Sequence, residues 1–83
     1  KEGNFTFDRM YVNRDVFIGL KPGEEEGSLN DISNYKDVTI GGYDPSRGTQ
    51  LYVDGNVTIR GVNLTSNLTI YATGTVTINY STI

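Results

Sequence analysis

The chain contains no cysteine and no histidine among its 83 residues. The first absence excludes disulfide and thiolate chemistry, and the second removes the commonest general base and metal ligand. No apolar run approaches the roughly 20 residues that a membrane-spanning helix needs. The formal net charge is −3 and the seven basic residues form no patch, so we expect neither nucleic acid as a partner nor a membrane span.

An eleven-residue pattern that occurs four times is the most informative feature present. Its copies occupy residues 10–20, 32–42, 51–61 and 70–80, at offsets of 22, 19 and 19 residues and without gaps. Position seven is always valine and position nine always isoleucine: Val16 and Ile18, Val38 and Ile40, Val57 and Ile59, Val76 and Ile78. A fixed period of about 20 residues is typical of a solenoid, in which each repeat buries its apolar face on its neighbours.

The alternation of apolar and polar residues within each copy predicts two short strands separated by a polar turn. With the connecting segment, each copy would make one coil, and Phe5 and Phe7 would belong to an incomplete leading coil. We therefore predict an all-β chain with a single domain over residues 1–83. The expected fold is a parallel β-helix, or solenoid, of about four coils with a repeat of 19–22 residues.

A small antiparallel β-sandwich is the alternative fold. Three-residue loops at 54–56 and 73–75 would pair the apolar residues on either side of them in register, and Asp-Gly is a strong hairpin signal. In that fold the strand at residues 1–12 would insert into a neighbouring copy by donor-strand exchange. The solenoid is favoured because hairpins do not require the same residues to return at steps of 19, whereas stacked coils do.

Stacked coils would bring equivalent side chains into outward-facing columns. Tyr11, Tyr52 and Tyr71 would form one such column, with their rings about 4.8 Å apart, the spacing of neighbouring strands. Stacked tyrosines are a candidate platform for a sugar ring or a partner subunit, although more often they cover the edge of a sheet. A second column would contain Phe17 and then three threonines, Thr39, Thr58 and Thr77. We interpret that ladder as structural, since threonine favours exposed strand surface.

A third column would place Asp15, Asp37 and Asn56 one above another. Two carboxylates one strand apart repel, and calcium, which takes several oxygen ligands, is one mediator. The neighbouring column offers a more economical answer, because Arg14 and Lys36 lie beside the two carboxylates and compensate their charge. We therefore expect no cofactor. The strands carry no cluster of carboxylates, Lys or Arg of the kind that pectin-cleaving β-helices use, so we expect no enzymatic activity.

Five Asn-x-Ser/Thr acceptors for N-glycosylation are present, at Asn4, Asn56, Asn63, Asn67 and Asn79. The motif indicates glycosylation only in a chain that enters a secretory or surface pathway, and a chain rich in asparagine and threonine produces some copies by chance. Four of the five lie between residues 56 and 83, where Arg60 is the only charged residue. Sugars would supply the hydration that this stretch lacks, and they favour an extracellular location.

The ends of the repeat suggest how copies of the chain associate. A terminal coil exposes unpaired backbone groups on an apolar core, and the sequence predicts neither a helix nor a long polar segment beyond the first and last copies. We therefore expect head-to-tail stacking into a polymer. Its predicted interface residues are Phe5, Phe7, Ile78, Tyr80 and Ile83. The sequence starts with Lys1 rather than Met, so we expect either a matured product, which we favour, or a trimmed fragment.

The Val-x-Ile rungs between residues 10 and 80 resemble, in organisation, polymer-forming β-solenoid proteins such as the bactofilins. That resemblance implies short parallel coils that stack end to end into filaments without nucleotide. The abundant threonine and asparagine and the glycosylation motifs depart from that family and favour the cell surface over the cytoplasm. We predict a structural subunit of an extracellular pilus-like or fibre-like filament. The alternative is a carbohydrate-binding module or a fragment of a larger β-helical adhesin or phage fibre.

Overall fold

The computed structural model describes residues 3–83, and strands dominate it. The strands are β1 (Gly3–Thr6), β2 (Arg9–Val12), β3 (Val16–Gly19), β4 (Lys36–Gly41), β5 (Thr49–Val53), β6 (Val57–Ser66), β7 (Leu68–Ala72) and β8 (Val76–Thr82). A single 3-10 helix, η1 (Ile32–Asn34), interrupts the long loop between β3 and β4. The predicted all-β class is confirmed.

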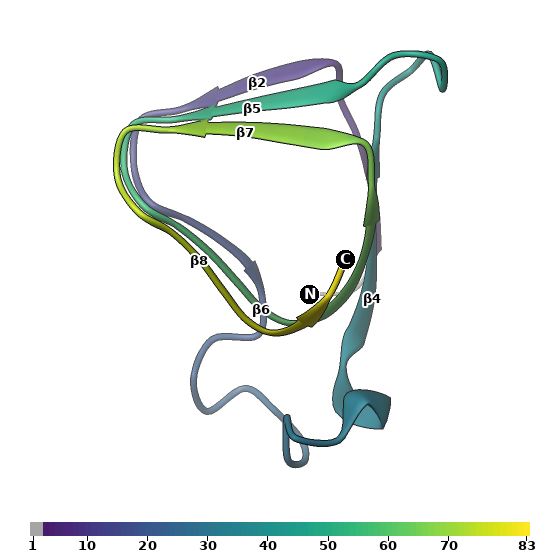
Figure 1. Cartoon of the computed structure of the whole chain (residues 1–83), viewed down its shortest axis with the longest axis vertical. Coiled ribbons are helices and arrows are strands. Elements are labelled where there is room, and N and C mark those ends of the chain that lie inside the picture. The colour runs from purple at the N-terminus through teal and green to yellow at the C-terminus, as the bar shows by residue number, and fades with distance from the viewer. Residues whose placement is uncertain (1–2) are drawn as a thin grey trace.

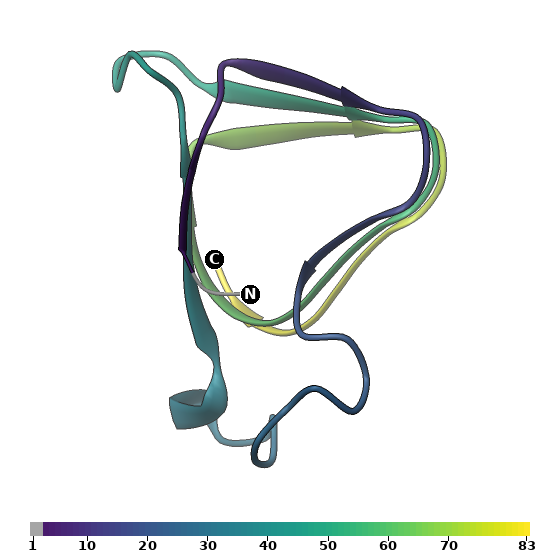
Figure 2. The ribbon, with the colours of Figure 1, turned by 180° about the vertical axis from the view of Figure 1, so that it is seen from behind.

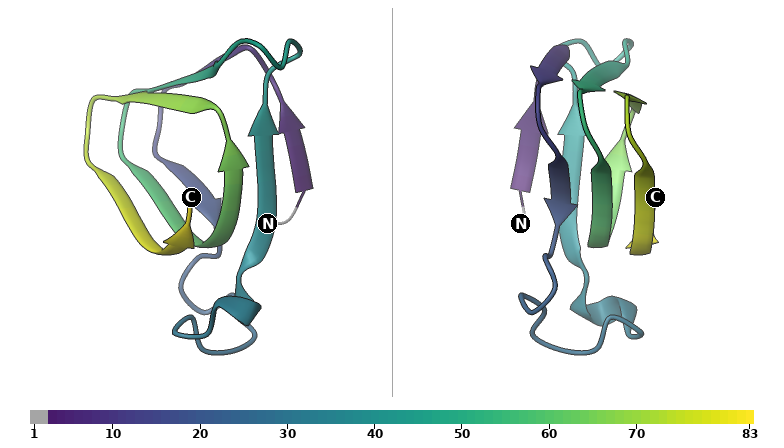
Figure 3. Two further views of the ribbon diagram at one scale, coloured as in Figure 1. Left: turned by 45° about the vertical axis from the view of Figure 1, so that its right-hand side comes forward. Right: turned by 90° about the vertical axis from the view of Figure 1, so that its left-hand side faces the viewer.

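The strands wind around three sides of a triangle, which is visible when the molecule is viewed down its shortest axis (Figure 1) and from behind (Figure 2). We call the three sides face A, face B and face C. Face A contains β1, β4 and residues 62–66 of β6; face B contains β2, β5 and β7; face C contains β3, residues 57–60 of β6 and the start of β8. Strands of one face lie side by side along the short axis (Figure 3).

All six ladders that join the strands of residues 3–83 are parallel. The alternative prediction of an antiparallel sandwich is therefore wrong. Residues 54–56 and 73–75 form corners that carry the chain from face B to face C, not hairpin loops. The segment considered as a donor strand, residues 1–12, contains β1 and β2, which pair with β4 and β5 of their own chain; Lys1 and Glu2 lie outside the described residues.

The copy at residues 32–42 does not stack on the other three, which corrects the sequence interpretation. Val38 lies between Gly3 and Leu64 on face A, whereas Val16, Val57 and Val76 form a column on face C. The physical reason is that a Val-Thr-Ile triplet suits any face of a winding with three faces. Thr39 and Ile40 lie on face A together with Val38. Residues 20–35, which precede β4, form a loop outside the triangle. Three circuits result, so the prediction of about four coils is not confirmed. The first contains β1, β2 and β3; the middle one contains β4, β5 and residues 57–60 of β6; the last contains residues 62–66 of β6, β7 and β8.

The core lies inside the middle circuit. Val57 is fully buried and Ile59 is 2% exposed. Their counterparts in the last circuit are far more accessible, because Val76 is 43% exposed and Ile78 is 51% exposed. Side chains of the same type in the same column therefore differ in burial according to whether a circuit covers them on both sides.

The corner between faces B and C is held by a ladder of side-chain to backbone hydrogen bonds. The Asp15 carboxylate accepts a hydrogen bond from the Asn56 backbone N–H (2.8 Å), and the Asn56 side-chain oxygen accepts one from the Thr75 N–H (2.8 Å). Asp37, predicted to share this column, lies on face A, where its carboxylate accepts a hydrogen bond from the Asn63 side-chain amide (3.1 Å). The two carboxylates are thus not stacked, and the reason for considering calcium disappears.

Gly19 occupies the corner between faces C and A. Its φ of +109° lies in the region that favours glycine, and a Cβ at this position would collide with the Arg60 carbonyl oxygen and the Val62 side chain. The absence of a side chain therefore allows the first and second circuits to approach closely where the loop of residues 20–35 begins.

Arg60 anchors that loop to the winding. Its guanidinium donates hydrogen bonds to the Leu20 carbonyl oxygen (3.0 Å) and to the Glu25 carboxylate (2.7 Å), and it lies 5.9 Å from the centre of the Tyr80 ring. The hydrogen bond from Arg60 is the main reason that the pKa of Glu25 is lowered from its ordinary value of 4.5. The sequence showed Arg60 only as an isolated charge, so this role was missed.

We expect the anchoring of the loop to depend on pH. Because the pKa of Glu25 is lowered on folding, the carboxylate stabilises the anchored loop at pH values above 4.5, and this stabilisation is lost as the pH falls through the lowered pKa. Amide exchange of residues 20–35 should be faster in Glu25→Gln than in the unaltered protein at neutral pH, and the difference should vanish in acid. Glu26→Gln is the control. Glu26 is 86% exposed, and its ion pair with Lys36 is long, at 3.9 Å between Oε1 and Nζ, so its loss should have little effect on the loop. An acid-independent difference would contradict the assignment.

Candidate functional site

Three tyrosine rings form a continuous stack on the outside of face B. Tyr11 of β2 lies 4.8 Å from Tyr52 of β5, and Tyr52 lies 4.7 Å from Tyr71 of β7, measured between ring centres. The rings are nearly parallel, with interplanar angles of 12° and 10°. The predicted stacking at the strand spacing is confirmed. Tyr11 is 70% exposed and Tyr71 is 50% exposed, so both ends of the stack are accessible to solvent.

The orientation of these rings limits what they can bind. A sugar packs best on an aromatic face that lies open to solvent, but the rings of this stack turn their faces toward each other. Within residues 3–83, only the outer faces of Tyr11 and Tyr71 have no ring stacked on them. These two faces can each receive a further flat group, and the strand spacing of the stack matches another tyrosine on another rung.

A shallow groove of about 910 Å³ runs beside the tyrosine stack. Its polar residues include Asn13, Asp54 and Thr73, and the Thr73 hydroxyl donates a hydrogen bond to the Asp54 carboxylate (3.0 Å). The groove thus combines ring edges with amide, carboxylate and hydroxyl groups, which are the groups that bind the hydroxyls of a sugar.

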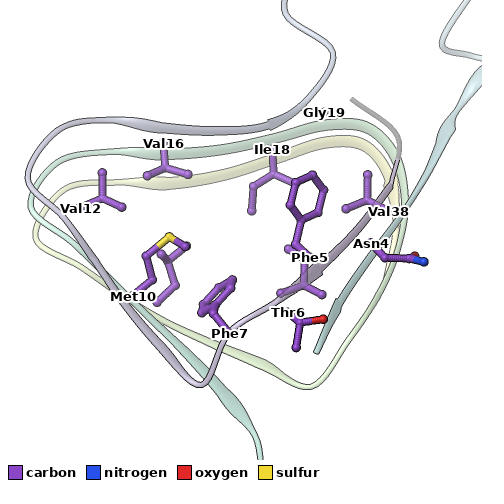
Figure 4. A pocket seen from close by; sticks show the side chains of 12 residues that line it. Asn4, Phe5, Thr6, Phe7, Met10, Val12, Val16, Ile18, Gly19 and Val38 are labelled. Carbon is purple, nitrogen blue, oxygen red and sulfur yellow. The ribbon is translucent and has the colours of Figure 1, made fainter. Parts of the chain in front are cut away.

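The N-terminal end face is the open mouth of the first circuit, formed by Phe5, Phe7, Met10, Val12, Val16 and Ile18. These side chains point into the triangle around a cavity of about 390 Å³ (Figure 4). Phe5 is 46% exposed and Met10 is 41% exposed, whereas Phe7 packs partly buried against the core. Exposed apolar side chains gathered in this way are typical of a surface that another element covers.

The C-terminal end face is formed by Ile70, Ala72, Val76 and Ile78 at the opposite end of the winding. Ile83, which follows β8 and was predicted at the interface, is 72% exposed. Tyr80, also predicted there, instead lies at the corner between faces C and A, beside Arg60. Its backbone φ of 48° is in the left-handed region. Met10 and Val76 were not among the predicted interface residues. Each is the outermost member of an apolar column that the repeat indicates, and this signal could have found them.

The structure separates the predicted outer columns and the glycosylation candidates. Phe17, Thr58 and Thr77 form a ladder on face C, whereas Thr39 lies between Asn4 and Thr65 on face A. The side chains of Asn56 and Asn63 take part in hydrogen bonds with neighbouring rungs. The remaining three candidates, Asn4, Asn67 and Asn79, are exposed, as Asn56 also is. Glycosylation stays a prediction, and modification of Asn56 or Asn63 would have to disturb these hydrogen bonds.

The part of the chain that the structure describes contains no group of three or more His, Cys, Asp or Glu side chains arranged to hold a metal ion. Over the same residues, 3–83, no helix is both long and apolar enough to span a membrane. Within residues 3–83, the tyrosine stack, the groove beside it and the two apolar end faces are the surfaces described above as able to bind a partner. A scan of protein-family models and searches of curated proteins and of solved structures each found no match to this chain.

Proposed function

We propose that this winding is a short parallel β-solenoid that serves as the structural subunit of an extracellular filament, with copies stacked head to tail. The observation that carries the proposal is that both end faces are exposed and apolar and contain the outermost members of the same columns. The four columns are Met10, Leu51 and Ile70; Val12, Val53 and Ala72; Val16, Val57 and Val76; Ile18, Ile59 and Ile78. A second copy placed on the C-terminal end face would extend all four.

The backbone register supports such a joint. β8 pairs with β6 as far as Thr82, which lies opposite Asn63, so β8 leaves Thr65 and Ser66 without a partner on that side. On face A, Thr65 lies in the same column as Asn4, with Thr39 of β4 between them. Ser66 lies in the same column as Phe5, with Ile40 of β4 between them. β1 of the next copy would therefore pair with the free end of β6, following β8 along the same level.

The side chains on the outside are also compatible with this joint. The Tyr71 ring would receive the Tyr11 ring of the next copy, which continues the stack at its own spacing. On the same face, Arg9 of the next copy would lie beside Thr69, which is neutral. Both residues belong to the column of Gln50, Arg9 on its one side and Thr69 on its other. No like charges are brought together at these positions, and apolar burial is the main contribution to association.

A pair of cysteines tests this joint directly, because the chain has none of its own. In one molecule Arg9 and Thr69 are separated by Gln50 and thus by two strand spacings, about 9.6 Å, which exceeds the reach of a disulfide of about 7 Å. Between stacked copies they would be about 4.8 Å apart. We expect Arg9→Cys/Thr69→Cys to form a ladder of disulfide-linked oligomers on oxidation, seen on a non-reducing gel.

Gln50→Cys/Thr69→Cys is the matched control, because these residues are neighbours within one molecule and should yield a linked monomer. Long uniform threads in negative-stain electron microscopy should accompany the oligomer ladder. If the control closes its disulfide while Arg9→Cys/Thr69→Cys stays monomeric at every concentration, head-to-tail stacking is refuted. The extracellular location is tested by the intact mass of the protein from its natural source, which should exceed the sequence mass in hexose-sized steps.

Carbohydrate binding is the second candidate function, and the groove beside the tyrosine stack favours it. The groove offers ring edges and polar groups, but the stacked ring faces give a sugar less contact than an open platform would. As part of a larger β-helical adhesin or fibre, the same end faces would be covered by further coils of one chain. Glycan binding by a monomer that Asp54→Ala abolishes would favour the second candidate over the filament.

A further inference from the structure

We infer that the tyrosine stack is a site of oxidative coupling, at which a one-electron oxidant joins neighbouring tyrosines into dityrosine. The two ring-to-ring distances, 4.8 and 4.7 Å, bring Tyr52 next to a phenol on either side. Because the rings are stacked and nearly parallel, a tilt of one ring can bring its Cε, the carbon beside the phenol oxygen, toward the next ring. This inference goes beyond the proposed assembly, and the coupling within one molecule does not depend on it.

The composition of the chain directs one-electron oxidation to tyrosine. Cysteine and tryptophan, the side chains that would compete for such an oxidant, are absent. The only methionine, Met10, points into the triangle from the N-terminal end face and gains oxygen rather than forming a bond to another side chain (Figure 4). Tyr11 and Tyr71 have the exposure that both oxidant access and a tilt of the ring require.

The reaction balances with a haem peroxidase and hydrogen peroxide as the oxidant. Each of two phenols loses its hydroxyl proton and one electron, and the two phenoxyl radicals combine through a Cε–Cε bond. The hydrogen on each coupled carbon then moves to the phenol oxygen and restores both aromatic rings. One peroxide takes up the two protons and two electrons and leaves as two waters, so the linked protein is two hydrogen atoms lighter.

Tyr43 provides a matched control within the same chain. It lies in the loop between β4 and β5 and is 76% exposed, more than any tyrosine of the stack, and within residues 3–83 it stacks on no ring. If exposure alone determined coupling, Tyr43 would react most. If proximity determines it, the links should join Tyr11 to Tyr52 and Tyr52 to Tyr71.

The test is to oxidise dilute protein with peroxidase and hydrogen peroxide, measure dityrosine fluorescence, and map the linked peptides by mass spectrometry. Tyr52→Phe should lower the yield of intramolecular dityrosine at least about tenfold, because a neighbouring phenol has a high effective concentration. Tyr43→Phe should leave the yield unchanged. Tyr52→Phe should stay folded, since the Tyr52 hydroxyl makes only a long hydrogen bond to Gln50 (3.4 Å), and circular dichroism checks this. An undiminished yield in Tyr52→Phe, or links mainly through Tyr43, would overturn the inference.

The same variant separates this inference from the proposed filament. Tyr11 and Tyr71 are two rungs apart in one molecule, with residue 52 between them, so only stacked copies bring them together. In concentrated Tyr52→Phe, a link from Tyr71 of one copy to Tyr11 of another would support both the coupling site and the joint. Intramolecular links in the unaltered protein without this intermolecular link would support the coupling site and refute the filament.

Discussion

Replacing Ile59 by alanine is expected to lower the free energy of unfolding by about 3 kcal/mol, within the roughly 2–5 kcal/mol found for such truncations in cores. Ile59 is 2% exposed, because circuits cover it on both sides, so its truncation leaves a cavity that the surrounding strands cannot readily fill. A domain of this size has a total stability of only about 5–15 kcal/mol, so the loss is a large share of it. Urea unfolding followed by circular dichroism measures the change.

Ile78→Ala is the matched control for that experiment. Ile78 occupies the same column and has the same side chain, but it is 51% exposed in the single molecule. Its truncation should cost about 1 kcal/mol or less when the protein is dilute and monomeric. Equal losses for the two variants would show that the middle circuit is not the core that the burial pattern indicates.

Replacing Ile78 by lysine is expected to abolish assembly while preserving the fold. In the proposed joint, Ile78 lies on Ile18 of the next copy, where an ammonium group would be buried without a partner at a cost of several kcal/mol. In the isolated molecule the same lysine reaches solvent from the C-terminal end face. Sedimentation velocity across a concentration series should show a monomer for Ile78→Lys under conditions in which the unaltered protein sediments as large oligomers.

Thr77→Lys adds the same charge one residue earlier and serves as the control. Thr77 belongs to the outward ladder of Phe17, Thr58 and Thr77, so its replacement keeps the lysine in water on either side of the joint. It should assemble like the unaltered protein. If Ile78→Lys also assembles normally, the C-terminal end face is not the contact surface.

Repetition in the sequence predicted part of this fold and misplaced another part. The 19-residue offset between residues 51–61 and 70–80 fixed the register of β5 on β7 and of β6 on β8, and the rung partners agree with it. Residues 32–42 carry the same Val-Thr-Ile triplet but belong to face A. Alternating β-branched residues specify a strand with one buried side, which all three faces require, so the triplet alone cannot identify its face.

The candidate site was predictable to a similar extent. The tyrosine stack followed from column positions alone, because side chains on equivalent rungs of a parallel ladder lie one strand spacing apart. Predicting the open C-terminal end face would have required knowing which circuit covers which. The contact between Arg60 and Glu25 joins residues 35 apart in sequence, through a loop without any periodicity. No repeat pattern carries information about such a contact.

The loop of residues 20–35 leaves face C after β3 and returns at β4 on face A (Figure 1). The winding on either side of it is joined by its own ladders, so the loop forms no part of a circuit, and Arg60 holds it against the outside of the winding. In a head-to-tail stack, each copy of three circuits would present one such loop. The loops would lie about 14 Å apart along one side of the fibre, which is three strand spacings. The winding would then set a regular spacing between the anchored loops along the fibre.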